Sequence, residues 1–184
     1  MNTELILLCH AATHATKAGI FPSRDDPIDP ADCSDLANRL GMNGRRVVTG
    51  PARPARETAA AISADASVDL SFADLDYGRW HGRSIRDVHD EDPQGLAAWL
   101  SDPSSAPHGG ESIEQLATRV ISGLELYARG EPHVIVTHAI VVKIMLARVL
   151  DAPIASVYAM DLEPLAPVRI VGGEAHWRLR VRAC

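Results

Sequence analysis

Cysteine, lysine and long apolar runs are all scarce in this sequence, and each shortage excludes a class of protein. The three cysteines, Cys9, Cys33 and Cys184, form no Cys-x-x-Cys pair and are odd in number. They therefore argue against a disulfide framework and fit a reducing compartment. No apolar run reaches the length that spans a bilayer, and no basic segment precedes the first one, so we expect neither a membrane span nor a signal peptide. The sequence predicts a soluble, cytoplasmic protein.

Positive charge is also in short supply. The formal net charge is −6, which argues against a general nucleic-acid surface. The basic residues are nearly all arginines, with Lys17 and Lys143 as the only lysines, and this imbalance carries little functional weight. The 184 residues are 46% hydrophobic and 23% charged, as in a globular chain with a substantial core. We expect one domain over residues 1–184.

Short apolar segments alternate with helical patterns along the chain. We expect strands at 5–9, 45–49, 68–71 and 133–138, and a C-terminal hairpin formed by 168–171 and 175–181. We expect helices at 30–41, 53–62, 84–100 with a break near Pro93, 112–129 and 140–150. This alternation predicts an α/β three-layer sandwich, with a mostly parallel central sheet and helices on both faces.

Two of the expected strands run directly into a histidine, His10 and His138. In parallel sheets the chemistry gathers beyond the carboxyl ends of the strands, so both histidines should lie on the same rim. One buried histidine at a strand end is as readily explained by a backbone hydrogen bond. A second histidine on a matching strand favours a shared functional site.

Five segments occur in an order that resembles the histidine phosphatase superfamily, also called the phosphoglycerate mutase-like family. They are "LLCHAAT", "VTGPARPARETAAAI", "DLDYGRWHG", "PHGGESIEQLATRV" and "VIVTHA". The resemblance covers nearly the whole chain and implies the phosphoglycerate mutase-like fold. It further implies a phosphomonoester hydrolase that acts on a small phosphorylated metabolite and needs no cofactor or metal.

The same resemblance assigns three catalytic residues. His10 occupies the position of the nucleophile that becomes a phosphohistidine, and a neutral imidazole suits that role near pH 7. His138 matches the histidine that holds the phosphoryl oxygens in the transition state. Asp74 falls on the acidic position that protonates the leaving oxygen and then activates water, a role helped by the raised pKa of a carboxyl beside phosphate. Asp76 is the fallback for that role.

Four further residues are expected to contact substrate. Thr13 matches the threonine of the first motif, and Thr16 falls where the family often has a phosphate-contacting asparagine. Tyr77 is expected on the leaving-group side, although packing beneath its loop explains an aromatic residue there equally well. Arg53 is the expected phosphate clamp, for the reason given next.

Two arginines that clamp phosphate in the family are missing from their positions. Cys9 and Pro54 stand there instead. Each charge-assisted contact to phosphate contributes about 1.5–3 kcal/mol, so losing both would slow the reaction by several powers of ten unless other cations replace them. Arg53 lies one residue before the expected position, and Lys17 and Arg24 are alternative sources of charge.

These departures leave a second hypothesis open: a catalytically weak or inactive family member that binds a phosphorylated ligand or a protein partner. The Cys9-His10 pair does not favour a metal site, because no motif of metal-ligand spacing accompanies it. The expected partner is a small phosphorylated metabolite, with neither nucleic acid nor membrane, and a homodimer is left open. The specificity loops carry no recognisable substrate signature.

Overall fold

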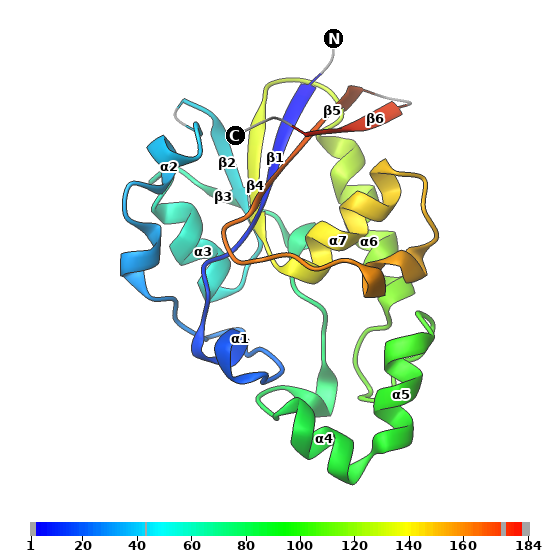
Figure 1. Ribbon diagram of the computed structural model, residues 1–184. Coiled ribbons are helices and arrows are strands. Elements are labelled where there is room, and N and C mark those ends of the chain that lie inside the picture. The colour runs from blue at the N-terminus through cyan, green and yellow to red at the C-terminus, as the bar shows by residue number, and fades with distance from the viewer. Residues whose placement is uncertain (1–2, 43, 174–175, 182–184) are drawn as a thin grey trace.

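A central sheet with strand order β3-β2-β4-β1-β5-β6 organises the molecule (Figure 1). The computed structural model describes residues 3–42, 44–173 and 176–181. The strands are β1 (Thr3–Cys9), β2 (Arg46–Thr49), β3 (Ser67–Val68), β4 (His133–Thr137), β5 (Pro167–Gly173) and β6 (His176–Arg180). The β1–β4, β2–β4 and β2–β3 pairings are parallel, whereas β1–β5 and β5–β6 are antiparallel. The predicted mostly parallel sheet is confirmed.

Helices cover both faces of this sheet, and others lie beyond its carboxyl edge (Figure 1). The α-helices are α1 (His14–Ala18), α2 (Leu36–Arg39), α3 (Arg53–Ala60), α4 (Ile85–Glu91), α5 (Pro93–Ser101), α6 (Ile113–Leu126) and α7 (Ala139–Val149). Short 3-10 turns are η1 (Pro30–Cys33), η2 (Leu70–Phe72), η3 (Gly78–Trp80) and η4 (Ile154–Ala159). The predicted break near Pro93 is confirmed, because α4 ends before it and α5 starts on it.

The alternation of side chains along β1 divides the core into two layers. Leu5 and Leu7 pack into one cluster with residues of α6 and α7, whereas Ile6 and Leu8 pack into another with residues of α2 and α3. All four are 0% exposed. A strand buried on both faces fits its continuous apolar sequence, and it carries the following residue, 10, to the middle of the carboxyl edge.

Two predicted elements are wrong in detail. The expected helix at 30–41 is interrupted, because Ser34 is extended and Asp35 has a positive φ of 52°, so η1 and α2 replace one continuous helix. The expected strand at 68–71 is only Ser67–Val68. Asp69 then accepts a hydrogen bond from the Ser71 N–H and starts η2, which turns the chain away from the sheet.

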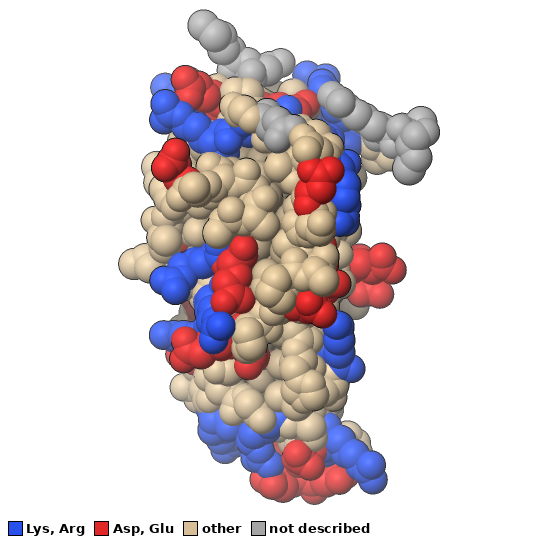
Figure 2. All heavy atoms as spheres, turned by 90° about the vertical axis from the view of Figure 1, so that its left-hand side faces the viewer, with Lys and Arg blue, Asp and Glu red and all other residues tan. Residues whose placement is uncertain are grey.

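Charged side chains of both signs lie side by side on the molecular face shown in Figure 2, without a single large basic field. No helix within the described ranges is long and apolar enough to cross a bilayer. The predicted C-terminal hairpin is confirmed as β5 and β6, although Ala175 of that prediction lies outside the described residues, as does Cys184.

Thr58 fixes α3 to the chain segment that follows β1. Its hydroxyl donates to the carbonyl of Pro54 at 2.8 Å and accepts from the N–H of Ala11 at 3.0 Å. Thr58 is 0% exposed, so water cannot replace either hydrogen bond. Arg53 extends the attachment, since its backbone N–H donates to the carbonyl of Arg24 at 2.9 Å.

We therefore expect Thr58→Val, which keeps the shape and removes the hydroxyl, to lower the free energy of unfolding by about 1–3 kcal/mol. Urea unfolding with an unchanged m value measures this. Thr58→Ser is the matched control and should retain most of the stability, because it keeps the hydroxyl. A Thr58→Val protein as stable as the parent would contradict this role.

Candidate active site

His10 and His138 meet at the carboxyl edge of the sheet, as predicted. The backbone N–H of His10 donates to the carbonyl of Thr137 at 2.8 Å, which continues the β1–β4 ladder by one residue. The two imidazole centroids lie 4.7 Å apart with an interplanar angle of 74°. His10 is 7% exposed and His138 is 4% exposed, so both rings are held in a nearly dry site.

A backbone contact sets the tautomer of His10. Its Nδ1 lies 2.7 Å from the carbonyl oxygen of Ala11, which can only accept, so Nδ1 carries the proton and donates. In the neutral ring, Nε2 then has a free lone pair. Burial, reinforced by His138, lowers the pKa of His10 to about 4, so the imidazole is neutral through the physiological range. Such a group can act as a nucleophile without first losing a proton.

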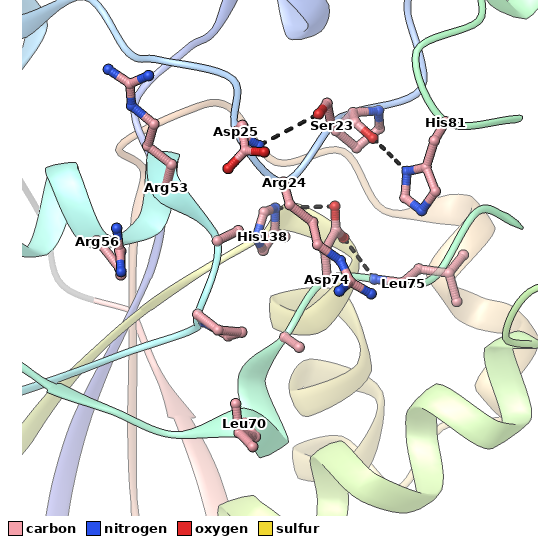
Figure 3. Close-up of a pocket in the computed structure, with 14 residues that line it drawn as sticks. Ser23, Arg24, Asp25, Arg53, Arg56, Leu70, Asp74, Leu75, His81 and His138 are labelled. Atoms are coloured by element: carbon pink, nitrogen blue, oxygen red, sulfur yellow. Dashed lines mark hydrogen bonds and ion pairs between the residues drawn. The ribbon is translucent and has the colours of Figure 1, made fainter.

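His138 pairs with Asp74, as Figure 3 shows. The Nδ1 of His138 lies 3.2 Å from the Asp74 Oδ2. Burial lowers the pKa of His138 to about 3 and raises the pKa of Asp74 to about 6. The Nε2 of His138 is buried and has no hydrogen-bond partner among the described residues. A buried polar atom of this kind usually has a hydrogen-bond partner, and an oxygen atom of a ligand is a suitable one.

Arg119 of α6 fixes the backbone around Asp74. Its guanidinium donates to the carbonyls of Ser71 and Ala73, each at 3.0 Å, and of Asp74 at 2.8 Å. Both carboxylate oxygens of Glu111 accept from the same guanidinium at 2.8 Å. All five donors of the fork are thereby directed at neighbouring acceptors, which makes Arg119 the anchor of the segment that carries Asp74.

The loop after Asp74 is joined backbone to backbone to the loop before α6. Arg79 donates through its N–H to the carbonyl of His108 at 3.0 Å, and the Glu111 N–H donates to the carbonyl of Asp76 at 2.9 Å. A Cβ on Gly110 would collide with that Asp76 carbonyl, and a Cβ on Gly78 would meet the His108 backbone. The two glycines therefore permit the contact between the "DYG" and "GGES" segments.

A chamber of 200 Å³ brings together several of the predicted residues. Its lining includes the three predicted catalytic residues, His10, Asp74 and His138. The predicted substrate contacts Thr16 and Tyr77 also line it, as does Cys9, which stands where the family has an arginine. The ring centroid of Tyr77 also lies 5.2 Å from that of Phe21, so the packing explanation holds, whereas its contact with a leaving group stays a prediction.

Thr13 and Thr16 also have a structural role, because they cap the N-terminus of α1. Their side chains form a capping box at the start of α1, with their hydroxyl oxygens 3.0 Å apart. Thr16 lines the chamber of His10, whereas Thr13 is not among the residues that line it. Their contacts with substrate stay predictions.

The positive charges lie next to this chamber and not in it. None of the described residues that line the chamber is an arginine or lysine. A larger cavity of 440 Å³ shares Pro22, Asp74 and His138 with it and is lined by Arg24, Arg53 and Arg56. No cation thus compensates for Cys9 in the lining of the chamber within the described residues, and the binding of phosphate there stays a prediction.

Of these arginines, Arg53 is the one with a carboxylate partner. Its Nε lies 2.7 Å from the Glu57 Oε1, and its side chain points away from His138 in Figure 3. The Arg24 side chain extends towards Asp74 in the same view. Neither Arg24 nor Arg56 has a carboxylate at ion-pair distance in the part of the chain that the structure describes. The clamp role of Arg53 stays a prediction, and it requires the pair with Glu57 to open.

Cys9 is chemically quiet in this setting. Burial raises the pKa of its thiol to about 12, and the nearby Asp74 adds to the shift, while the backbone N–H of Ala139 donates to the sulfur. A protonated thiol is a poor nucleophile and a poor metal ligand. Over the ranges that the structure describes, no group of three or more His, Cys, Asp or Glu side chains is arranged to hold a metal ion.

A comparison with known protein families matches almost the whole chain to one of them. Residues 5–184 match the histidine phosphatase superfamily, branch 1. The chain belongs to this superfamily. The resemblance drawn from the five sequence segments is thereby confirmed.

Among histidine phosphatase relatives, the bifunctional protein Rv2228c of Mycobacterium tuberculosis is 28% identical over 174 residues, covering 88% of this chain and 48% of that protein. The chain thus spans about half the length of this mycobacterial relative. The adenosylcobalamin/alpha-ribazole phosphatase of Salmonella typhimurium is 29% identical, with 92% of this chain and 89% of that protein covered. The solved structure of YhfR from Bacillus stearothermophilus superposes with a TM-score of 0.87 at 21% identity, covering 97% and 96% of the two chains.

Sequence reasoning missed the role of Arg119. Its segment matched the superfamily pattern, but no task was attached to the arginine. Glu111 lies just before the N-cap Ser112 of α6 and Arg119 lies inside that helix, so no helical spacing in the sequence pairs the two. The hydrogen bonds to the carbonyl groups of Ser71, Ala73 and Asp74 depend on the fold of the 71–74 segment, which sequence pattern does not specify.

We expect the imidazoles of His10 and His138 to stay neutral down to acidic pH, with midpoints at about 4 and about 3, because burial disfavours their charged forms. Nitrogen NMR of the side chains, followed from pH 8 to pH 3, measures both midpoints and should show the His10 proton on Nδ1. The spectrum of the exposed His14 serves as an internal signal reference for the measurement. A midpoint near 6.5 for His10 would contradict the geometry described above.

Proposed function

We propose that this protein is a phosphatase that hydrolyses a small phosphomonoester through a phosphohistidine at His10. The observation that carries the proposal is the state of His10: its Nδ1–H is committed to the Ala11 carbonyl, so the Nε2 lone pair is free in a chamber shared with His138 and Asp74. No metal or organic cofactor takes part in the proposed reaction.

The reaction proceeds in two displacements. First, Nε2 of His10 attacks phosphorus, the bond between phosphorus and the ester oxygen breaks, and protonated Asp74 gives its proton to the departing alkoxide. Second, ionised Asp74 takes a proton from water as the water oxygen attacks phosphorus, and the phosphorus–nitrogen bond breaks. Inorganic phosphate leaves, and the proton balance returns to its starting point.

His138 stabilises the transferring group in this scheme. When Asp74 is protonated, its O–H donates to Nδ1 of His138, which puts the imidazole proton on Nε2. That N–H is buried and unpartnered among the described residues, so it donates to a phosphoryl oxygen without first breaking another hydrogen bond. The single Asp74 proton therefore sets the His138 tautomer in the ground state, and its hydrogen bond to Nδ1 breaks when the proton passes to the departing alkoxide.

Charge compensation is the weak point of the proposed site. Two neutral histidines cannot balance a phosphoryl dianion, and Cys9 and Pro54 supply nothing. We propose that Arg24, which lines the adjoining cavities and extends towards Asp74, provides the first positive charge, with Arg53 as a second contact. We expect slower turnover than an enzyme with both arginines in place would show, because solvent screens an exposed cation.

The relatives support a phosphatase. The Salmonella protein that is 29% identical over 92% of this chain is an adenosylcobalamin/alpha-ribazole phosphatase. The competing hypothesis, a weak or inactive member that binds a phosphorylated ligand or a protein, draws on the same missing arginines. Retention of His10, His138 and Asp74 together favours the enzyme, since binding alone requires no nucleophile.

We expect His10→Ala to lower phosphate release by about 10³-fold or more, because it removes the nucleophile. A panel of small phosphomonoesters with colorimetric phosphate detection measures this. His14→Ala, an exposed substitution in α1, is the matched control and should retain full activity. Full activity in His10→Ala would exclude this mechanism, and release from no substrate despite retained ligand binding would favour the binding protein.

For alkyl phosphomonoesters we expect kcat/KM to rise with pH through about 4, as His10 loses its proton, and to fall through about 6, as Asp74 loses the proton that the leaving alkoxide needs. The profile is corrected for the second ionisation of the substrate phosphate. Asp74→Asn should lower kcat by about 10²–10⁴-fold and abolish the fall.

p-Nitrophenyl phosphate serves as the matched substrate control, since its leaving group needs no proton. Its kcat/KM should fall less through about 6 than that of the alkyl esters, because only the donor state of His138, and not the leaving group, then depends on the Asp74 proton. An alkaline limb that persists unchanged for alkyl substrates in Asp74→Asn would show that another group is the acid.

A further inference from the structure

Two hollows meet at Asp74, and the alcohol portion of a substrate must enter one of them. One, of 440 Å³, lies against α3, and the other, of 560 Å³, lies against the start of α6. Arg24, Ala73 and Asp74 line both. Below they are called the α3 hollow and the α6 hollow. Their charges decide which of them suits which leaving group.

The α6 hollow is acidic in effect. Asp76 and Glu111 contribute carboxylates to its lining, and Gln115 is neutral. Its own cation, Arg119, is committed to Glu111 and to three backbone carbonyls, including that of Asp74. An anionic leaving group would meet these carboxylates there. The one guanidinium in this hollow that is not paired with a carboxylate among the described residues is Arg24, which is shared with the α3 hollow and assigned above to the phosphoryl group.

The α3 hollow is basic. Arg24, Arg53 and Arg56 line it, against the carboxylate of Asp25 and the catalytic Asp74. The remaining wall is mostly apolar and consists of Pro22, Pro51, Ala52, Leu70, Ala73 and Leu75, with Ser23, His81 and His138. Figure 3 shows these side chains surrounding one space. The hollow therefore combines an apolar wall with cations on its solvent side, since all three arginines are exposed residues.

Arg56 is the arginine of this hollow that has neither a carboxylate partner among the described residues nor a role in the proposed reaction. Arg53 is paired with Glu57, and Arg24 is assigned above to the phosphoryl group. Arg56 has no carboxylate at ion-pair distance among the described residues. Its backbone is fixed, because its N–H donates to the Ala52 carbonyl at 3.1 Å and Thr58 ties the same helix to Ala11. Its position relative to His10 is therefore set by the fold.

We propose that the α3 hollow is the leaving-group subsite and that the substrate is a phosphomonoester whose alcohol portion carries a second anionic group, bound by Arg56. This proposal rests on the proposed function, since it takes the phosphoryl group to be held at His10. A guanidinium binds a carboxylate through charge-assisted hydrogen bonds, which a neutral group of the same shape cannot match.

The test uses phosphorylated hydroxy acids with two to five methylene groups between the phosphate ester and the carboxylate, each paired with its primary amide. The amide is neutral and nearly isosteric. We expect kcat/KM for the best carboxylate to exceed that of its amide by roughly tenfold or more. Arg56→Gln should bring this ratio close to one by slowing the carboxylate alone.

Arg46→Gln is the matched control. It removes the same charge from the amino end of β2, where Arg46 is paired with Glu131, and should leave the ratio unchanged. Equal rates for carboxylate and amide in the parent protein would overturn the proposal. An equal loss for both substrates in Arg56→Gln would overturn it too, because Arg56 would then contact the transferring phosphoryl group.

Binding measurements test the leaving-group subsite independently of the proposed phosphatase activity. Calorimetry with His10→Ala measures affinity for the same pairs without turnover. Tighter binding of carboxylates than amides, lost in Arg56→Gln, supports the subsite even if the parent protein releases no phosphate, which would refute only the phosphatase. Phosphate release without any preference for the carboxylate refutes only the subsite.

Discussion

The hydrogen bond from the His10 N–H to the Thr137 carbonyl is the constraint on which the site depends. It extends the pairing of two fully buried parallel strands by one residue and brings the two imidazole centroids to 4.7 Å. Because both strands are held from two faces by separate core layers, neither histidine can move without moving the sheet. The same burial removes water and keeps both rings neutral, which suits one as a nucleophile and the other as a donor.

The proposed acid, Asp74, is held by a different kind of structure. Asp74 lies on an irregular segment, where carbonyl groups have no partners in a strand or helix, and Arg119 provides those partners from α6. Glu111 balances the arginine, so the site gains order without gaining a free positive charge. This explains how a buried carboxyl keeps a raised pKa close to a guanidinium: the fork serves backbone carbonyls and another carboxylate. In the proposed function, positive charge for a ligand comes instead from Arg24 and from the arginines at the start of α3.

Much of this arrangement was predictable from the sequence, for identifiable reasons. The buried strands can be recognised in the sequence as apolar runs. Because these strands are parallel neighbours, the residues that follow them, His10 and His138, must lie on the same edge of the sheet. The interruption at Asp35 and the early end of β3 were not predictable, because both depend on local backbone choices that short polar residues leave open. The pairing of Arg53 with Glu57 is visible as an i, i+4 spacing, but whether a ligand competes with it depends on the site.

Rapid mixing with substrate, acid-free quenching and mass mapping of the phosphorylated residue test the central claim most directly. If neutral His10 is the nucleophile, a transient phosphoryl group is found on its imidazole, it is stable to base and labile to acid, and it is absent from His10→Ala. Turnover at the parent rate with no phosphoryl group on His10 at any quench time would contradict the account.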